Sequence, residues 1–166
     1  MKKLILTVIL MGCLLGKISA QYLVEAMGLE AFDKSIIVDN AFLEYIWTMD
    51  NLALENDLQL LVQGRGFRES GVPVRNAIVD PAQNSNHHVG HAVDINIVYN
   101  GTLYNSSKLA NYNSLPQAIK NFISGCKRNG LRWGGDFTVA DPVHFDDNLY
   151  LRDKKTYDAL YLEFQN

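Results

Sequence analysis

The sequence is poor in the features that define several common kinds of protein. It has two cysteines among 166 residues, Cys13 and Cys126, and no Gly-x-Ser-x-Gly motif. Cys13 lies in an N-terminal segment that we expect to be removed, so the mature chain has no intramolecular disulfide. Cys126 falls within an apolar helical pattern, which is typical of a buried side chain and not of a nucleophile. Stability must therefore come from a hydrophobic core, for which 48% hydrophobic residues in one domain suffice.

Basic residues are also in the minority, with 15 Lys and Arg against 18 Asp and Glu. The first 20 residues contain three of the lysines and no acid, so their removal leaves 12 basic and 18 acidic side chains and a formal charge of −6. Such a surface does not attract nucleic acid. We expect a monomer without a nucleic-acid partner.

Residues 1–20 have the pattern of a secretory signal: Lys2 and Lys3 precede a nearly continuous apolar run over 4–15, and small residues end at Ala20. Cleavage there leaves a domain of residues 21–166, exported to the periplasm, the cell envelope or the medium. The run is shorter than the roughly 20 residues that span a bilayer, so a retained anchor is the weaker alternative and no stable membrane span is expected after processing. Leu10-Met11-Gly12-Cys13 leaves lipid attachment at Cys13 open.

Strand and helix patterns alternate irregularly along the rest of the chain. Helices are predicted over about 42–52 behind an Asp39-Asn40 cap, from a Ser114 cap with Pro116 in the first turn to Asn129-Gly130, and over 153–164. Strands are predicted over 58–62, 92–98, 131–133 and around 143–145, with a short apolar run at 35–38. This order favours a small single α+β domain, with a largely antiparallel sheet and flanking helices.

Three of the four histidines fall between residues 87 and 91, and the fourth is His144. In the strand 92–98 the apolar residues occupy one face and Asp94 the other, and His144 likewise points away from its apolar neighbours. A catalytic zinc needs three protein ligands and an open position, and a loop histidine, Asp94 and His144 can supply them. The spacing does not decide which loop histidine takes part. Surface loops also carry His and Asn without a metal, and Asp94 could simply cap a turn.

Two motifs resemble those of a known family. They are Ser85-x-His87-x-x-Gly90-x-Ala92-x-Asp94, and Trp133-Gly134-Gly135-Asp136-Phe137 followed by Asp141-Pro142-Val143-His144-Phe145-Asp146. The first matches the SxHxxGxAxD signature of peptidase family M15, which contains D-alanyl-D-alanine carboxypeptidases and L-alanyl-D-glutamate endopeptidases. The other motif is similar to the WGGDW and DxPHFE segments of its endolysin-like branch. The resemblance covers about residues 58–146.

The resemblance implies a zinc ion held by His87, Asp94 and His144, with His88 and His91 left as loop or supporting residues. It also implies Asp141 as catalytic acid/base, although Asp-Pro is a common turn opening as well. Arg68 corresponds to a family arginine that steadies the substrate or the oxyanion. Arg65 departs from the family, which has a small residue there. Ser85 is expected to support the His87 loop, and Asp136 to be structural.

The substrate that the resemblance implies is the stem peptide of peptidoglycan. The endolysin-like motif favours cleavage at L-alanyl-D-glutamate over removal of the terminal D-alanine, for a bacterium remodelling its wall or a phage lysing one. The alternatives are a D-alanyl-D-alanine carboxypeptidase and, from another class, a non-catalytic zinc-stabilised wall-binding domain. Such a binding domain would have no need of Asp141.

Overall fold

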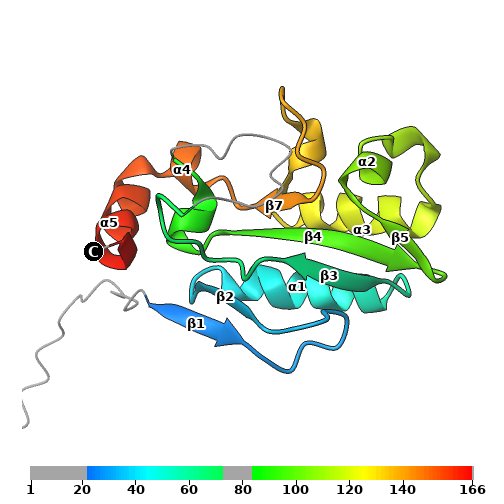
Figure 1. The fold of residues 1–166 in the computed structure, drawn as a ribbon, viewed down its shortest axis with the longest axis horizontal. Helices are drawn as coiled ribbons and strands as arrows, with labels where there is room; N and C mark the ends of the chain where they lie inside the picture. The colour runs from blue at the N-terminus through cyan, green and yellow to red at the C-terminus, as the bar shows by residue number, and fades with distance from the viewer. Residues whose placement is uncertain (1–21, 73–83, 166) are drawn as a thin grey trace, which may run out of the picture.

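Two antiparallel sheets and their flanking helices make up the structure, a computed structural model that describes residues 22–72 and 84–165 (Figure 1). The expected signal segment 1–20, with Cys13, lies outside the described residues, so the signal and the start of the domain stay predictions. Among the described residues, no helix combines the length and apolarity needed to cross a membrane.

The larger sheet has five strands and is antiparallel throughout. Its main path runs β3 (Gln59–Gln63), β4 (Ala92–Tyr99), β7 (His144–Asp146) and β6 (Arg132–Trp133), and β5 (Thr102–Tyr104) also pairs with β4. The alternation predicted for β4 is present, since Val93, Ile95 and Ile97 are buried and Asp94 and Asn96 are partly exposed. The predicted α+β class with a largely antiparallel sheet is confirmed.

A smaller sheet of β1 (Leu23–Ala26) and β2 (Ile36–Asp39) lies beside β3. The Ile37 N–H donates to the Arg65 carbonyl and the Phe67 N–H donates to the Ile37 carbonyl, each over 2.7 Å. The loop after β3 is therefore attached to β2. This contact requires Gly66, whose φ is +86° and whose position would bring a Cβ within 2.6 Å of the Ile37 oxygen.

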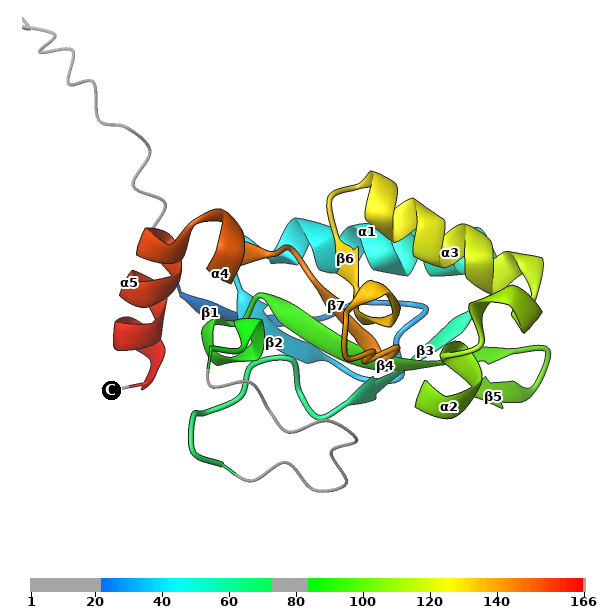
Figure 2. The ribbon, with the colours of Figure 1, turned by 90° about the horizontal axis from the view of Figure 1, so that it is seen from above.

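Helices α1 (Leu43–Leu54) and α3 (Gln117–Arg128) lie side by side over one face of the large sheet (Figure 2). Their apolar stripes enter the core, which includes Ile46, Phe122 and the fully buried Cys126. The short α2 (Ser106–Leu109) follows β5, and α4 (Leu149–Arg152) and α5 (Lys154–Gln165) close the chain. Short 3₁₀ turns are η1 (Asn86–Val89), η2 (Tyr112–Ser114) and η3 (Gly134–Asp136).

Both predicted helix caps are wrong. Ser114 lies in η2, where its hydroxyl donates to the Asn111 carbonyl, and Pro116 is the extended cap residue before α3. Asp39 ends β2, and its carboxylate accepts from the Ala41 N–H, so α1 begins after Phe42 with no side-chain cap. In each case the polar side chain satisfies a turn next to the helix, as Ser and Asp also commonly do.

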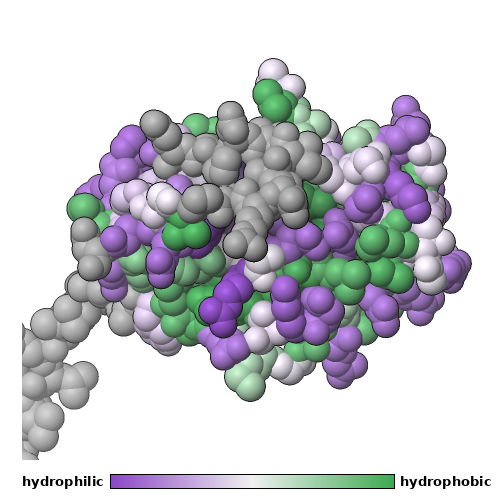
Figure 3. Space-filling model, in the orientation of Figure 1, coloured by the Kyte–Doolittle hydropathy of each residue, from purple (hydrophilic) through white to green (hydrophobic). Residues whose placement is uncertain are grey.

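Hydrophilic and hydrophobic residues are interspersed over the face seen in Figure 3.

Below the surface, a buried ion-pair network joins three segments at the end of β2. The His91 ring is 4% exposed, with Nδ1 3.0 Å from an Asp147 oxygen and Nε2 3.3 Å from an Asp39 oxygen. Arg152 donates to the same Asp147 oxygen over 2.8 Å. His91 thus has a structural role in joining β2 to the start of α4.

This network predicts a pH-dependent stability. Burial opposes the charged form of His91, but the hydrogen bonds and charges of Asp147 and Asp39 outweigh it and raise the pKa of His91 above 6.5. A raised folded-state pKa gives a stabilisation that is complete below the unfolded pKa and is lost as the pH rises through the folded one. We therefore expect the difference in free energy of unfolding between wild type and His91→Gln to shrink as the pH rises above about 6.5.

Urea unfolding of both proteins without metal measures this difference, because the other titrating groups are common to the two. A difference that stays constant or grows with pH would contradict the assignment of a charged His91.

Candidate metal centre

His87, Asp94 and His144 meet at one end of the β4–β7 pair and can hold a metal ion. His87 Nε2 lies 3.2 Å from Asp94 Oδ1 and 3.2 Å from His144 Nδ1, and His144 Nδ1 lies 3.0 Å from Asp94 Oδ1. Both histidines are buried, whereas the Asp94 side chain is 25% exposed. The cluster is therefore enclosed by protein with one side accessible from solvent.

The outer nitrogens of both rings are committed to other partners. His87 Nδ1 is 2.7 Å from the Gly66 carbonyl, and His144 Nε2 is 3.0 Å from an Asp146 oxygen. Each partner is an acceptor, so each of these nitrogens carries the proton. His87 Nε2 and His144 Nδ1 then present lone pairs to each other and to the Asp94 carboxylate. Three acceptors that face one another need a cation among them.

The spacing of the three atoms suits a small tetrahedral ion. With zinc–ligand distances of about 2.0–2.1 Å, the ligand atoms of a regular tetrahedron lie about 3.3 Å apart. The observed separations of 3.0–3.2 Å are close to that value. The residues present thus fit a three-ligand zinc site with a fourth position left over.

In the absence of a metal, the close approach of these groups shifts the pKa of His144 and that of Asp94 in opposite directions. Burial lowers the pKa of His144, but its hydrogen bonds and charge interactions with Asp146 and Asp94 raise it to about 9. Burial raises the pKa of Asp94, but the two histidines hold it far below the usual range. Because the pKa of His144 is raised, a metal that binds at this cluster competes with a proton.

Local structure explains how residues far apart in sequence reach this point. Asp94 on β4 is the direct antiparallel partner of His144 on β7, so their side chains leave the same face of the sheet. His87 is in η1, where the Ser85 hydroxyl accepts from the His87 N–H and Gly90 ends the turn with φ +70°. Ser85 thus supports the His87 loop, as expected.

Asp146 supports His144 from the side away from the ligand cluster, and sequence reasoning missed it. Arg132 donates to both Asp146 oxygens over 2.7 and 2.6 Å, and the Asn86 amide donates to one of them over 2.9 Å. Burial raises the pKa of Asp146, but the bonds from His144 and Arg132 keep it below its usual range. A period of two from His144 along the strand could have indicated this aspartate.

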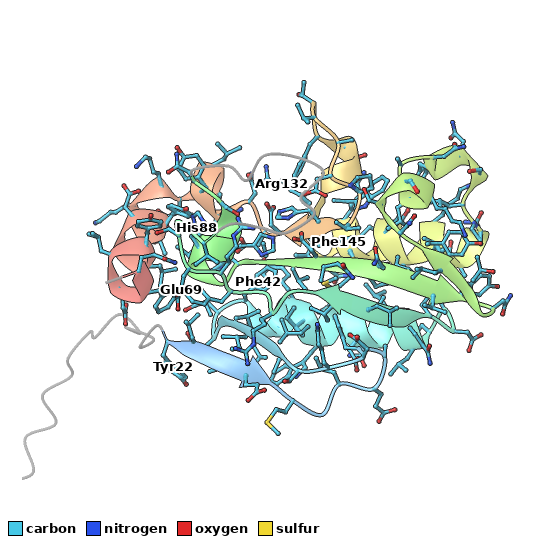
Figure 4. All side chains as sticks on the ribbon, in the orientation of Figure 1. Tyr22, Phe42, Glu69, His88, Arg132 and Phe145 are labelled. Carbon is cyan, nitrogen blue, oxygen red and sulfur yellow. The ribbon has the colours of Figure 1, made fainter. Side chains whose placement is uncertain are left out.

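Arg132 also contacts an aromatic ring next to His144. Its guanidinium lies 4.9 Å from the centroid of Phe137, and the Phe137 ring lies 5.8 Å from that of His144. Figure 4 shows Arg132 above the strand that carries Phe145. The Arg132 side chain therefore contacts both Asp146 and Phe137, and each of these two residues lies next to His144.

Asp141 is half-buried at the end of the loop that leads into β7. Its carbonyl accepts from the His144 N–H over 3.0 Å, and its N–H donates to the Gly134 carbonyl over 2.9 Å. A Cβ on Gly134 would lie 2.1 Å from the Asp141 oxygen, so this approach requires glycine. Burial and then the charge of Asp94 raise the pKa of Asp141 above its ordinary value. Its catalytic role stays a prediction.

Arg68 approaches the site from the loop after β3. Its N–H donates to the His87 carbonyl over 3.0 Å, and its guanidinium interacts electrostatically with Asp94. Burial lowers the pKa of this guanidinium, against the opposing effect of Asp94, but an arginine stays charged. Its neighbour Arg65 is exposed, and only its backbone joins the loop to β2.

The remaining candidates lie apart from the ligand cluster. His88 is buried, with its ring 5.8 Å from that of Tyr161. Asp136 is exposed and pairs with Lys127 over 2.5 Å, which fits a structural role. Among the described residues, the only group of three or more His, Cys, Asp and Glu side chains close enough to hold a metal is therefore His87, Asp94 and His144.

A buried site of two histidines and one carboxylate with an accessible side is typical of metallohydrolases. Residues 79–147 match the sequence model of a family described as D-alanyl-D-alanine carboxypeptidase. The match covers 69 of the 166 residues and confirms the predicted resemblance to peptidase family M15. No curated protein matches the chain.

The outer contacts of His144 predict how metal affinity responds to mutation. Asp146→Asn removes the negative charge that holds His144 Nε2, and loss of such a partner typically weakens metal binding about 10- to 100-fold. Competition with a chromophoric chelator measures zinc affinity, and circular dichroism checks that the variant is folded. Asp136→Asn, the same change at an exposed site, is the control. Equal affinity of Asp146→Asn and wild type would contradict the role of Asp146.

Proposed function

We propose that the protein is an exported zinc peptidase that hydrolyses a peptide bond in the stem peptide of peptidoglycan. The observation that carries the proposal is the convergence of His87 Nε2, Asp94 Oδ1 and His144 Nδ1 within 3.0–3.2 Å, with the outer nitrogen of each histidine bonded to another acceptor. The family match over 79–147 supports a peptidase of the cell wall. Export is proposed from the signal pattern of residues 1–20.

A bound zinc would supply a Lewis acid and a coordinated water that ionises near neutral pH. Asp141 accepts the proton of the attacking water and returns it to the leaving amine, which requires one group to work in both protonation states. Its raised pKa brings these two states closer together in energy at neutral pH. Arg68 places a permanent positive charge where the carbonyl oxygen becomes negative.

The bond that we propose is L-alanyl-D-glutamate, on the basis of the endolysin-like segment over 133–146. The second candidate is removal of the terminal D-alanine, which the description of the matching family favours. Both reactions use the same metal, proton carrier and arginine, because the chemistry at the carbonyl is identical. The two reactions differ in the residues of the stem peptide on either side of the cleaved bond.

A non-catalytic wall-binding domain would keep the metal ligands but would not need a proton carrier. Asp141 argues against that alternative, because a half-buried carboxylate that interacts with the charge of Asp94 lowers stability, and a binding domain gains nothing in return.

Asp141→Ala tests the proposal directly. We expect release of new amino termini from purified peptidoglycan to fall about 10²- to 10⁴-fold, the usual range for loss of a general acid/base, with zinc still bound. A chelator should abolish the release by wild type, and zinc should restore it. The control is Asp136→Ala on the same loop, which should keep wild-type activity. Equal release by Asp141→Ala would refute the acid/base assignment, and no release by wild type would favour the binding domain.

A defined muropeptide that ends in D-alanyl-D-alanine separates the two candidate bonds. Mass spectrometry should detect a fragment that begins with D-glutamate, with L-alanine left on the muramic acid. Loss of a single D-alanine instead would assign the protein as a carboxypeptidase. The specificity lies in contacts beyond the carbonyl, so one product is expected to dominate.

A further inference from the structure

The C-terminal helix α5 packs against two segments that carry candidate functional residues. They are the loop after β3, which carries Arg68, and the turn η1, which carries His87. The Phe164 ring is 6.1 Å from the Phe67 ring, and the Tyr157 hydroxyl donates to the Ser85 carbonyl over 3.0 Å. Figure 4 labels Glu69 and His88, which belong to these two segments, near the helix, and the His88 ring lies 5.8 Å from that of Tyr161. The helix therefore packs on the Arg68 loop and on the His87 turn together.

The last described residue of α5, Gln165, connects the two segments through one side-chain amide. Its Nε2 donates to the His88 carbonyl over 2.7 Å and to the Arg68 carbonyl over 3.3 Å, and its Oε1 accepts from the Ser70 N–H over 2.6 Å. Both amide hydrogens and the amide oxygen are thus used. No other amino acid of this length offers two donors and one acceptor in a single planar group.

These bonds fix the backbone of Arg68 on both sides. Its N–H donates to the carbonyl of His87, a metal ligand, and its carbonyl accepts from Gln165. The residue after His87 is held by the same amide. The distance between the arginine and the ligand histidine is therefore set by a closed set of hydrogen bonds, and Gln165 is the member that comes from outside both segments.

We propose that Gln165 is a positioning residue, which holds Arg68 at the distance from the metal centre that transition-state stabilisation requires. This inference rests on the proposed function, in which Arg68 neutralises the developing oxyanion. Gln165 does not itself reach the reacting atoms and acts through the backbone of Arg68. A displacement of about 1 Å in such a group costs on the order of 100-fold in rate, so a loosened loop reduces turnover without loss of the fold.

Two substitutions separate hydrogen bonding from packing. Gln165→Glu keeps the shape and the acceptor for Ser70 but places a carboxylate oxygen against the carbonyls of Arg68 and His88. Gln165→Met keeps the apolar stem and removes every hydrogen bond. The matched control is Gln117→Glu, the same change at an exposed residue on α3. All proteins are studied as the full chain loaded with zinc.

Two readouts are needed, one of which does not depend on activity. Hydrogen exchange by mass spectrometry should be faster in residues 66–70 of both Gln165 variants, by about tenfold, and unchanged in β4. On peptidoglycan, kcat should fall about tenfold in both variants, while zinc affinity changes less than about threefold because the three ligands remain. The Gln117→Glu control should match wild type in every measurement.

The outcomes distinguish this inference from the proposed function. Unchanged exchange in residues 66–70 overturns the positioning role, whether or not wild type is active. Faster exchange with unchanged kcat overturns it as well, and so does full activity of Gln165→Met, which would reduce the role of the side chain to packing. A wild type without activity refutes the proposed function alone, and the exchange measurement then decides whether Gln165 orders the Arg68 loop.

Discussion

The antiparallel pairing of β4 with β7 is the constraint on which the site depends. It places Asp94 directly opposite His144, although 50 residues separate them in sequence. A slip of one residue would turn one of the two side chains to the opposite face, where the buried residues of α1 and α3 pack. The hydrophobic face of each strand therefore fixes the position of the ligands, and the stability of the core and the geometry of the site have a common origin.

The two histidines of the site, His87 and His144, each carry their ring proton on the nitrogen that points away from Asp94. The Gly66 carbonyl and the Asp146 carboxylate each take the proton of one ligand histidine, which leaves the inner nitrogens as acceptors. Arg132 then neutralises Asp146, so that the charge which holds His144 does not itself destabilise the interior. The outer carboxylate of Asp146 is thus paired with Arg132, while the two inner nitrogens and the Asp94 carboxylate converge as acceptors.

Sequence reasoning succeeded where the signal is local. The alternation along β4 indicated the face of Asp94, and the apolar stripe of α3 indicated its buried side, because both periods are properties of a single element. It could not choose among His87, His88 and His91 from spacing, and that assignment came from the family motif. In the structure, the ring of His88 lies beside Tyr161 and that of His91 between two carboxylates, so only His87 faces Asp94. Strands β1 and β5 were missed because each is short and gains its stability from pairing.

The contacts of Asp146 and Gln165 could not be predicted from the sequence for another reason. Arg132 meets Asp146 only through the pairing of β6 with β7, and Gln165 meets Ser70 across 95 positions of sequence. The period of two from His144 could have indicated the face of Asp146, but in both cases the partner lies on another element, which no pattern near the residue identifies. The predicted caps of α1 and α3 were wrong for a local reason, because the side chains of Asp39 and Ser114 form hydrogen bonds in adjacent turns.

The single thiol among residues 22–72 and 84–165 has a practical consequence. Cys126 is fully enclosed on α3, and burial raises the pKa of its thiol far above the ordinary value. A sulfur that neither ionises nor meets solvent does not exchange with glutathione or with a second chain, so an oxidising milieu leaves it untouched. Purified samples that lack residues 1–20 can accordingly be kept without dithiothreitol or mercaptoethanol, reagents whose own sulfur atoms would compete with the protein for zinc.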